Sequence, residues 1–186
     1  MPKPTHSLVH ANPTSRAQQL IEQLKLEPHP EGGWYREVFR SACTVIPQDG
    51  RPARNALTSI YFLLEAGNHS RWHRVLSDEV WIHLEGAPLT LWTAEIPSKQ
   101  LHQAWLSPVA RPDAPHTGSQ CGEPQQVVRA GLWQAAQPDP DDTHAFTLVA
   151  CAVAPGFDFL DFQLMRPDSV EARWMAAEHP HLAPPI

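Results

Sequence analysis

Short runs of alternating apolar and polar residues, rich in β-branched and aromatic side chains, fill the chain from Gly32 to about Arg166. Runs of this kind predict β-strands, and turn-forming residues separate them. The expected strands cover residues 34–40, 57–64, 70–75, 79–84, 89–93, 102–106, 126–129, 132–136, 146–153 and 159–165. Because no long helical segments alternate with them, parallel crossovers are excluded, and the pattern predicts an all-β antiparallel jelly roll or barrel.

Helical periodicity is found near the two ends of this region. Ser15 has the spacing of a helix N-cap, and four apolar residues follow it on one helical face: Ala17, Leu20, Ile21 and Leu24. We expect this short helix to cover one opening of the barrel. Near the C-terminus, Asp168 has capping-box spacing to Glu171 and predicts a second short helix, with Val170, Trp174 and Met175 on its apolar face.

The length of 186 residues suits a single domain. We expect this domain to span residues 15–178, preceded by a flexible segment at 1–14 and followed by a tail at 179–186. The segments 107–124 and 137–143 are polar and contain several prolines, so they are expected to be loops within the domain.

The composition argues against several classes of function. The formal net charge is -6 and lysine and arginine do not cluster, so we expect no nucleic-acid partner. No stretch reaches the ~18 apolar residues of a membrane helix, and the N-terminus lacks the apolar core of a signal peptide. The 3 cysteines are an odd number at wide spacings, unlike a secreted disulfide framework. We therefore expect a cytoplasmic protein with no membrane partner.

The segment 67–86 resembles the first sequence motif of the cupins. In that motif a glycine, a His-x-His pair, a glutamate and a second glycine recur at fixed spacing; Gly67, His73, Glu79 and Gly86 match it, and Val75 replaces the second histidine. A histidine and a glutamate on neighbouring strands can converge inside a barrel and offer a nitrogen and an oxygen to a divalent cation. The valine removes one donor from such a site.

The second cupin motif has its best match at residues 129–134, where Arg129 replaces a proline and Gln134 replaces a histidine. The set His73, Glu79 and Gln134 is therefore a candidate site for a divalent metal ion. An amide oxygen is a weak ligand for the metals such barrels often carry. The alternative is a hydrogen-bonded polar cluster that lines a pocket without a metal.

Longer segments resemble a family of small single-domain cupins catalogued as a domain of unknown function. These segments are PHPEGGWYREVFRS at 28–41, LTSIYFLL at 57–64, WHRVLSDEVW at 72–81, AGLWQAA at 130–136 and APGFDFLDFQL at 154–164. The resemblance implies an RmlC-like double-stranded β-helix, the cupin jelly-roll barrel, with a ligand pocket inside and assembly as a homodimer. It implies no single activity, because related barrels include sugar epimerases as well as binding and storage proteins.

Strand alternation adds candidates for the pocket. Glu79, Trp81 and His83 alternate and are expected to face inward together. Four residues separate Glu79 from His83, about 13 Å of extended strand, so His83 is a candidate proton-transfer residue rather than a metal ligand. Tyr61 and Trp81 are candidate ligand contacts, with core packing as the more common role of such aromatics.

Two charged residues complete the candidate set. Arg36 follows a pair of glycines and is a candidate clamp for an anionic group at the barrel mouth, with a surface salt bridge as the alternative. Asp158 and Asp161 have opposite strand parity, and we expect Asp161 to face the interior and contact the ligand.

Three functions are consistent with these residues. In the leading hypothesis the barrel binds a small polar metabolite and isomerises or epimerises it by proton transfer, with His73 or His83 as the base and Glu79 as its partner. A non-catalytic ligand-binding or sensory module would use the same pocket. A metal-dependent dioxygenase would require iron with an open coordination position.

Overall fold

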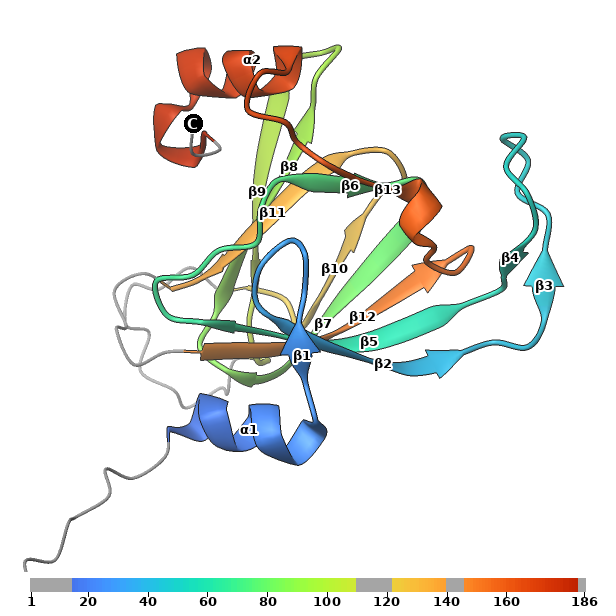
Figure 1. Cartoon of the computed structure of the whole chain (residues 1–186). Coiled ribbons are helices and arrows are strands. Elements are labelled where there is room, and N and C mark those ends of the chain that lie inside the picture. Colours follow the sequence, from blue (N-terminus) through green and yellow to red (C-terminus); the bar gives the residue numbers. More distant parts are fainter. Residues whose placement is uncertain (1–14, 110–121, 140–145, 184–186) are drawn as a thin grey trace, which may run out of the picture.

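The structure, a computed structural model, describes residues 15–109, 122–139 and 146–183 (Figure 1). Two antiparallel sheets face each other. The six-stranded sheet contains, in spatial order, β1 (Glu27–Pro28), β2 (Trp34–Arg40), β5 (Thr58–Glu65), β12 (Phe146–Ala154), β7 (Asp78–Gly86) and β10 (Gln125–Val128). The five-stranded sheet contains β13 (Phe162–Leu164), β6 (His73–Val75), β11 (Trp133–Pro138), β8 (Leu89–Glu95) and β9 (Gln100–Leu106). The expected all-β jelly roll is confirmed.

A separate two-stranded sheet lies outside the two main sheets. β3 (Thr44–Val45) and β4 (Arg54–Asn55) form a two-stranded ribbon that projects from the body of the molecule, at the right of Figure 1. The ribbon continues from the end of β2 and leads back into β5. It therefore extends the edge of the six-stranded sheet where β2 ends.

The main core lies between the two sheets. Phe62 and Leu64 of β5, Trp81 of β7 and Val149 of β12 meet Leu91 of β8, and each is at most 1% exposed. Burying an aliphatic or phenylalanine side chain contributes roughly 1.5–3 kcal/mol. The alternation of these strands therefore determines which of their residues face the barrel interior.

Helix α1 (Arg16–Leu24) packs on the outer face of the six-stranded sheet, below it in Figure 1. Ser15 caps it by accepting a hydrogen bond from the Gln18 N–H at 3.1 Å, as expected. Its apolar face contacts Leu63 and Leu148, which point outward from β5 and β12. β5 and β12 are apolar on both faces, so their outer face also needs a cover, and α1 supplies it. The expectation that this helix covers a barrel opening is therefore wrong.

Helix α2 (Val170–Glu178) also differs in detail from the sequence prediction. Its N-cap is Ser169, which accepts a hydrogen bond from the Ala172 N–H at 3.1 Å, whereas Asp168 pairs with Arg166 on the surface. Val170 is 64% exposed and lies off the apolar face. Trp174 and Met175 do pack against the barrel, as expected.

The expected C-terminal tail begins with a single turn, η2 (Pro180–Leu182), that packs on the domain. The Leu182 carbonyl accepts a hydrogen bond of 2.7 Å from the indole N–H of Trp72, and Leu182 joins the cluster around α2. The expected flexible segment at 1–14 and most of the two expected loops lie outside the described residues. None of the described helices is long and apolar enough to cross a membrane.

The strand expected at 159–165 is the clearest error in the secondary-structure prediction. Residues Phe159–Asp161 form a single 3₁₀ turn, η1, and β13 follows it. Asp158 caps η1 by accepting a hydrogen bond from the Leu160 N–H at 2.9 Å. Local capping of this kind competes with strand pairing, which explains why an apolar run rich in phenylalanine does not continue as a strand.

Candidate functional site

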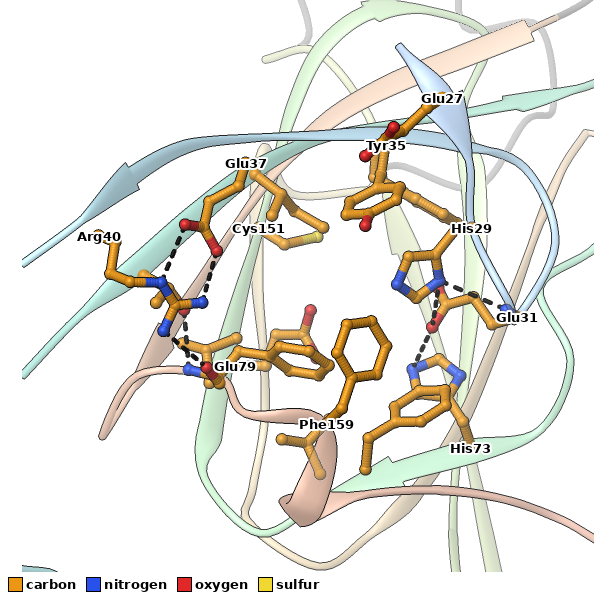
Figure 2. A pocket seen from close by; sticks show the side chains of 17 residues that line it. Glu27, His29, Glu31, Tyr35, Glu37, Arg40, His73, Glu79, Cys151 and Phe159 are labelled. Atoms are coloured by element: carbon orange, nitrogen blue, oxygen red, sulfur yellow. Dashed lines mark hydrogen bonds and ion pairs between the residues drawn. The ribbon is translucent and has the colours of Figure 1, made fainter. Parts of the chain in front are cut away.

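A cavity of about 140 Å³ opens at one end of the barrel, between the six-stranded sheet and the β6–β13 edge of the other sheet (Figure 2). Its wall combines titratable and aromatic side chains from separate parts of the chain. The lining residues are Glu27, His29, Glu31, Tyr35, Glu37, Arg40, Thr58, Ile60, Phe62, His73, Val75, Glu79, Cys151, Val153, Phe157, Phe159 and Phe162.

A tight turn between β1 and β2 places Glu31 in this wall. The His29 N–H donates to the Gly33 carbonyl, and the Gly32 N–H donates to the His29 carbonyl. Gly33 has φ +70, and a Cβ there would lie 2.6 Å from the Leu63 carbonyl oxygen, so the turn requires glycine. The Glu31 carbonyl then accepts a hydrogen bond from the Arg71 N–H, which ties the turn to the segment before β6.

That link brings Glu31 against His73, the first residue of β6. Oε2 of Glu31 lies 3.1 Å from Nε2 of His73, and the two side chains are 7% and 2% exposed. On the other side of the ring, His73 Nδ1 lies 2.8 Å from the Arg71 carbonyl oxygen. Because a carbonyl oxygen can only accept, Nδ1 carries a proton.

The pair therefore needs one further proton between Nε2 and the carboxyl oxygen. Burial lowers the pKa of His73 to about 4, with a smaller contribution from His29. Burial also raises the pKa of Glu31 well above its usual value, and the charge of Glu79 adds to this. Both shifts favour the neutral forms. The shared proton therefore favours Glu31, which donates it to the unprotonated Nε2 of His73.

His29 lies beside this pair at the same end of the cavity (Figure 2). Its Nδ1 lies 3.4 Å from Oε2 of Glu31, and it accepts a long hydrogen bond of 3.4 Å from the Glu31 N–H. Burial lowers the pKa of His29 to about 4. Its ring packs edge-on against Tyr35, with the ring centroids 4.5 Å apart.

A second buried polar group centres on Glu79 of β7. Nε2 of Gln134 donates to Glu79 Oε2 at 2.7 Å, and Oε1 of Gln134 accepts from the indole N–H of Trp81 at 3.1 Å. The Cys151 thiol also hydrogen-bonds to Glu79. Burial raises the pKa of Glu79, while the bonds from Gln134 and Cys151 oppose that change. The hydrogen bond from Gln134 thus holds the carboxyl group of Glu79 in position. Glu79 and Cys151 line the cavity.

The opposite side of the cavity carries an ion pair (Figure 2). Arg40 and Glu37 form two hydrogen bonds, of 2.9 and 2.6 Å, at the end of β2. Arg40 also donates to the Asn55 side chain at 2.9 Å and to the Phe157 carbonyl at 3.1 Å. The pair therefore holds the segment that precedes η1 in place beside the cavity.

Four of the sequence-predicted site residues lie in the barrel interior. His73, Glu79 and Gln134 are all buried in the barrel interior, and Gln134 pairs with His73 across β11 and β6. Glu79 contacts Gln134, whereas the partner of His73 is Glu31. Trp81 belongs to the core and touches the site through Gln134.

The other candidates lie away from the cavity. His83 is farther along β7, where its Nε2 lies 3.1 Å from the Ala87 carbonyl oxygen. Arg36 and Tyr61 face each other on the outer side of the six-stranded sheet, with the guanidinium carbon 5.7 Å from the ring centroid. Tyr35 and Glu37, the neighbours of Arg36, line the cavity instead. Arg36 therefore does not lie at the mouth of this cavity, where it was expected as an anion clamp, because side chains alternate along β2.

Asp161 has a structural role. Its two oxygens accept hydrogen bonds of 2.8 Å each from Nε and Nη2 of Arg54, and Arg51 adds a third bond of 2.7 Å. These bonds lower the pKa of Asp161, with Arg54 as the largest cause. The cluster joins η1 to the β3–β4 ribbon. Asp161 does not line the cavity, since it belongs to a 3₁₀ turn and not to the expected strand.

The predicted metal set does not fit a metal ion. The indole N–H of Trp81 can only donate, so the oxygen of Gln134 faces Trp81 and its NH₂ group faces Glu79. His73 is occupied at both ring nitrogens, by Arg71 and Glu31. Over the described ranges, no group of three or more His, Cys, Asp or Glu side chains is placed to hold a metal ion.

Sequence reasoning missed the partner of His73. Glu31, His29, Tyr35 and Glu37 all belong to the segment PHPEGGWYRE, which carried the family resemblance but no assigned chemistry apart from Arg36. The available signal was the paired glycines, which predict an unusual turn, together with a histidine and a glutamate inside that turn.

Comparison with known proteins agrees with this fold. A crystal structure of a Shewanella oneidensis protein is 32% identical with a TM-score of 0.70, covering 93% of this chain and 100% of that one. A hypothetical protein from Leishmania major is 29% identical with a TM-score of 0.70, covering 90% and 94%. The capsular polysaccharide assembling protein CapF of Staphylococcus aureus, 9% identical with a TM-score of 0.52 over 76% of this chain and 34% of that one, shares the fold alone.

None of the curated proteins matches the chain significantly in sequence. The family model described as "Cupin superfamily (DUF985)" matches residues 18–165, most of the chain. Its span includes both the turn that carries Glu31 and the strands that carry His73, Glu79 and Gln134. The chain therefore belongs to this family of the cupin superfamily.

Proposed function

We propose that the protein binds a small polar metabolite in the barrel cavity and transfers a proton at one of its carbon atoms, as isomerases and epimerases do. The buried contact between His73 and Glu31 is the observation that carries this proposal. The pair lines the cavity and is occupied by a single proton, so it can both give and take one.

The proposed step begins when the shared proton moves from Glu31 to Nε2 of His73, which leaves Glu31 as a carboxylate. Glu31 takes a proton from a C–H bond next to a carbonyl group of the ligand, and the electron pair of that bond moves onto the carbonyl oxygen as an enolate. The pair then holds two protons and one positive charge. That charge stabilises the enolate, since both lie in a buried site. Return of a proton to the ligand restores the resting pair.

Glu79 supplies a second group for the same chemistry. Its charge acts on Glu31, which places the two carboxyls within electrostatic range of each other, and both line the cavity. An epimerase must deliver the returning proton to the opposite face of the carbon. A protonated Glu79, held in position by Gln134 and Cys151, would serve as that donor.

Hydrogen exchange into the ligand tests this function. A small-molecule cell extract, supplemented with glucosamine, glucose and glucuronate, is incubated with the protein in heavy water, and mass spectrometry detects deuterium at carbon. We expect the wild type to label at least one compound and His73→Gln to lose the rate by about 100-fold or more. The variant His83→Gln is the matched control and keeps the rate.

A binding or sensory module is the second candidate. It is favoured by one observation: the polar groups of Glu37, Arg40 and Gln134 are already paired within the protein, as in a preformed recognition site. Native mass spectrometry that finds a retained ligand, combined with no deuterium at carbon in any compound, would select this candidate over the enzyme.

Homodimer assembly and a cytoplasmic location are also part of the proposal. Ile46, beside β3, is 80% exposed and Phe39 of β2 is 51% exposed, which suits coverage by a second copy. Sedimentation equilibrium that shows only monomer at micromolar concentration would contradict the dimer.

A further inference from the structure

Carboxyl groups outnumber basic groups on the wall of the cavity. Glu27, Glu31, Glu37 and Glu79 line it, whereas among the described lining residues Arg40 is the single arginine and there is no lysine. Both histidines of the wall are held neutral at pH 7 by burial, which lowers the pKa of each to about 4. The wall therefore offers little positive charge to an anion.

Arg40 does not offset this imbalance. Two of its hydrogen bonds go to the carboxylate of Glu37, and two more go to Asn55 and to the Phe157 carbonyl. A guanidinium has five N–H donors, so four of the five are already used. The charge of Arg40 is neutralised by Glu37 at a distance of 2.6 Å. An anionic ligand would have to displace this ion pair.

Aromatic rings form a large part of the remaining wall. Phe157, Phe159 and Phe162 pack edge to face, with centroids 5.0 Å apart for Phe157 and Phe159 and 5.9 Å apart for Phe157 and Phe162. Tyr35 and Phe62 also line the cavity. The face of an aromatic ring attracts a cation within about 6 Å of its centre, and cages of such rings recognise ammonium groups.

We infer that the cavity selects a small organic cation, a protonated amine on an apolar stem, over neutral and anionic ligands of the same shape. The apolar stem would contact the phenylalanines and the ammonium group would lie near Glu31 and Glu79. An apolar cavity of about 150 Å³ in another protein holds a benzene ring, so one six-membered ring is the expected size of the stem. This inference rests on the proposed function, because it assigns the ligand of the same cavity.

Binding of a cation should release protons. Burial raises the pKa of Glu31 and of Glu79, so the empty cavity keeps these carboxyls protonated to a higher pH than exposed carboxyls. An ammonium group beside them favours the carboxylate forms. The ligand therefore displaces protons into the solvent, and the measured heat of binding should vary with the ionisation enthalpy of the buffer.

Three probes of matched shape and different charge test the inference. Benzylamine, benzyl alcohol and benzoate are titrated into the full-length protein by isothermal titration calorimetry at pH 7. We expect benzylamine to bind at least about tenfold more tightly than benzyl alcohol, and benzoate to bind most weakly. Proton release should accompany benzylamine alone.

Variants locate the source of this preference. Glu31→Gln and Glu79→Gln should each reduce the preference for benzylamine over benzyl alcohol by about tenfold. Glu95→Gln makes the same change on the exposed end of β8 and leaves the preference unchanged. If a buried variant loses its near-ultraviolet circular dichroism, Phe159→Leu replaces it. Phe159 is 55% exposed, and loss of its ring should lower the preference several-fold.

Several results would overturn the inference. These are binding of benzoate or benzyl alcohol as tight as that of benzylamine, no binding of any probe at millimolar concentration, or an unchanged preference in the cavity variants. The proposed function fails separately. Deuterium exchange into glucose or glucuronate without a preference for benzylamine contradicts the cation alone, whereas a preference for benzylamine without exchange into any compound contradicts the proton transfer alone.

Discussion

Glu31 and His73 meet inside the barrel with their Oε2 and Nε2 atoms 3.1 Å apart, although 42 positions separate them in the sequence (73 - 31 = 42). The turn that carries Glu31 is fixed by the hydrogen bond from the Arg71 N–H to the Glu31 carbonyl. The Arg71 carbonyl in turn accepts a hydrogen bond from Nδ1–H of His73. One residue therefore positions both members of the pair.

The lowered pKa of His73 predicts a loss of stability in mild acid. Unfolded histidine binds a proton near its ordinary value of 6.5, while the folded protein resists protonation of His73 down to about 4. The unfolded state therefore binds more protons in this window, and the free energy of unfolding falls as the pH decreases from 6.5 through 4. The loss from this residue is about 3 kcal/mol.

Urea denaturation at several pH values measures this effect. His73→Gln should have a shallower dependence on pH between 6.5 and 4 than the wild type, because glutamine does not titrate. His102→Gln makes the same change at an exposed position of β9 and should keep the wild-type slope. A slope in His73→Gln as steep as in the wild type would contradict the assignment.

Glu31 predicts a dependence of opposite sign. Its folded pKa is raised above the ordinary value of 4.5, so its contribution to stability is present below that value and is lost as the pH rises through the folded pKa. Glu31→Gln removes this loss, and its amide NH₂ can donate to Nε2 of His73 as the protonated acid does. The free energy of unfolding of Glu31→Gln, relative to the wild type, should therefore increase with pH. A relative decrease would mean that Glu31 is ionised at rest.

Gln134 satisfies two buried groups at once, so its removal should be costly. Gln134→Leu leaves Glu79 without its amide donor and the indole N–H of Trp81 without its acceptor. We expect a loss of about 2–4 kcal/mol in the free energy of unfolding, measured by urea denaturation. Gln163→Leu is the control, since Gln163 accepts two hydrogen bonds from Arg74 on the surface; its effect should stay within about 0.5 kcal/mol. Equal effects in both variants would contradict the account.

Two arginine–aspartate pairs with the same two-bond geometry provide a matched comparison. Arg54 and Asp161 are 7% and 3% exposed, whereas Arg166 and Asp168 are 72% and 68% exposed. Arg54→Lys breaks the buried two-bond contact and should cost about 2–4 kcal/mol, while Arg166→Lys should cost at most about 0.5 kcal/mol. Thermal denaturation checks both. Similar shifts in Tm would show that the Arg54 pair does not anchor η1.

The sequence predicted the fold because the barrel is built from local patterns. Alternation along each strand identified most strands, and the matches to the two cupin motifs correctly placed His73, Glu79 and Gln134 in the interior. Alternation has a period of two, so an error of one residue reverses the face. Arg36 was expected at the barrel mouth because it follows paired glycines, without an assignment of strand faces, and it is Tyr35 and Glu37 that line the cavity.

The partner of His73 was beyond such reasoning. Glu31 lies in a turn without periodicity, and its position depends on a hydrogen bond to Arg71, far along the chain. Asp161 was misplaced for a related reason: its partners, Arg51 and Arg54, come from the β3–β4 ribbon, whose contact with η1 has no local signal. Contacts of this kind become visible only in the folded structure.

The protonation state of His73 tests the central claim most directly. Nitrogen-15 NMR of histidine-labelled protein at pH 7, with His73→Gln to assign the signals, reports both ring nitrogens of His73. We expect a neutral ring with the proton on Nδ1, an unprotonated Nε2, and a pKa of about 4 for His73. A doubly protonated ring at pH 7, or a neutral ring with its proton on Nε2, would contradict the single shared proton between His73 and Glu31.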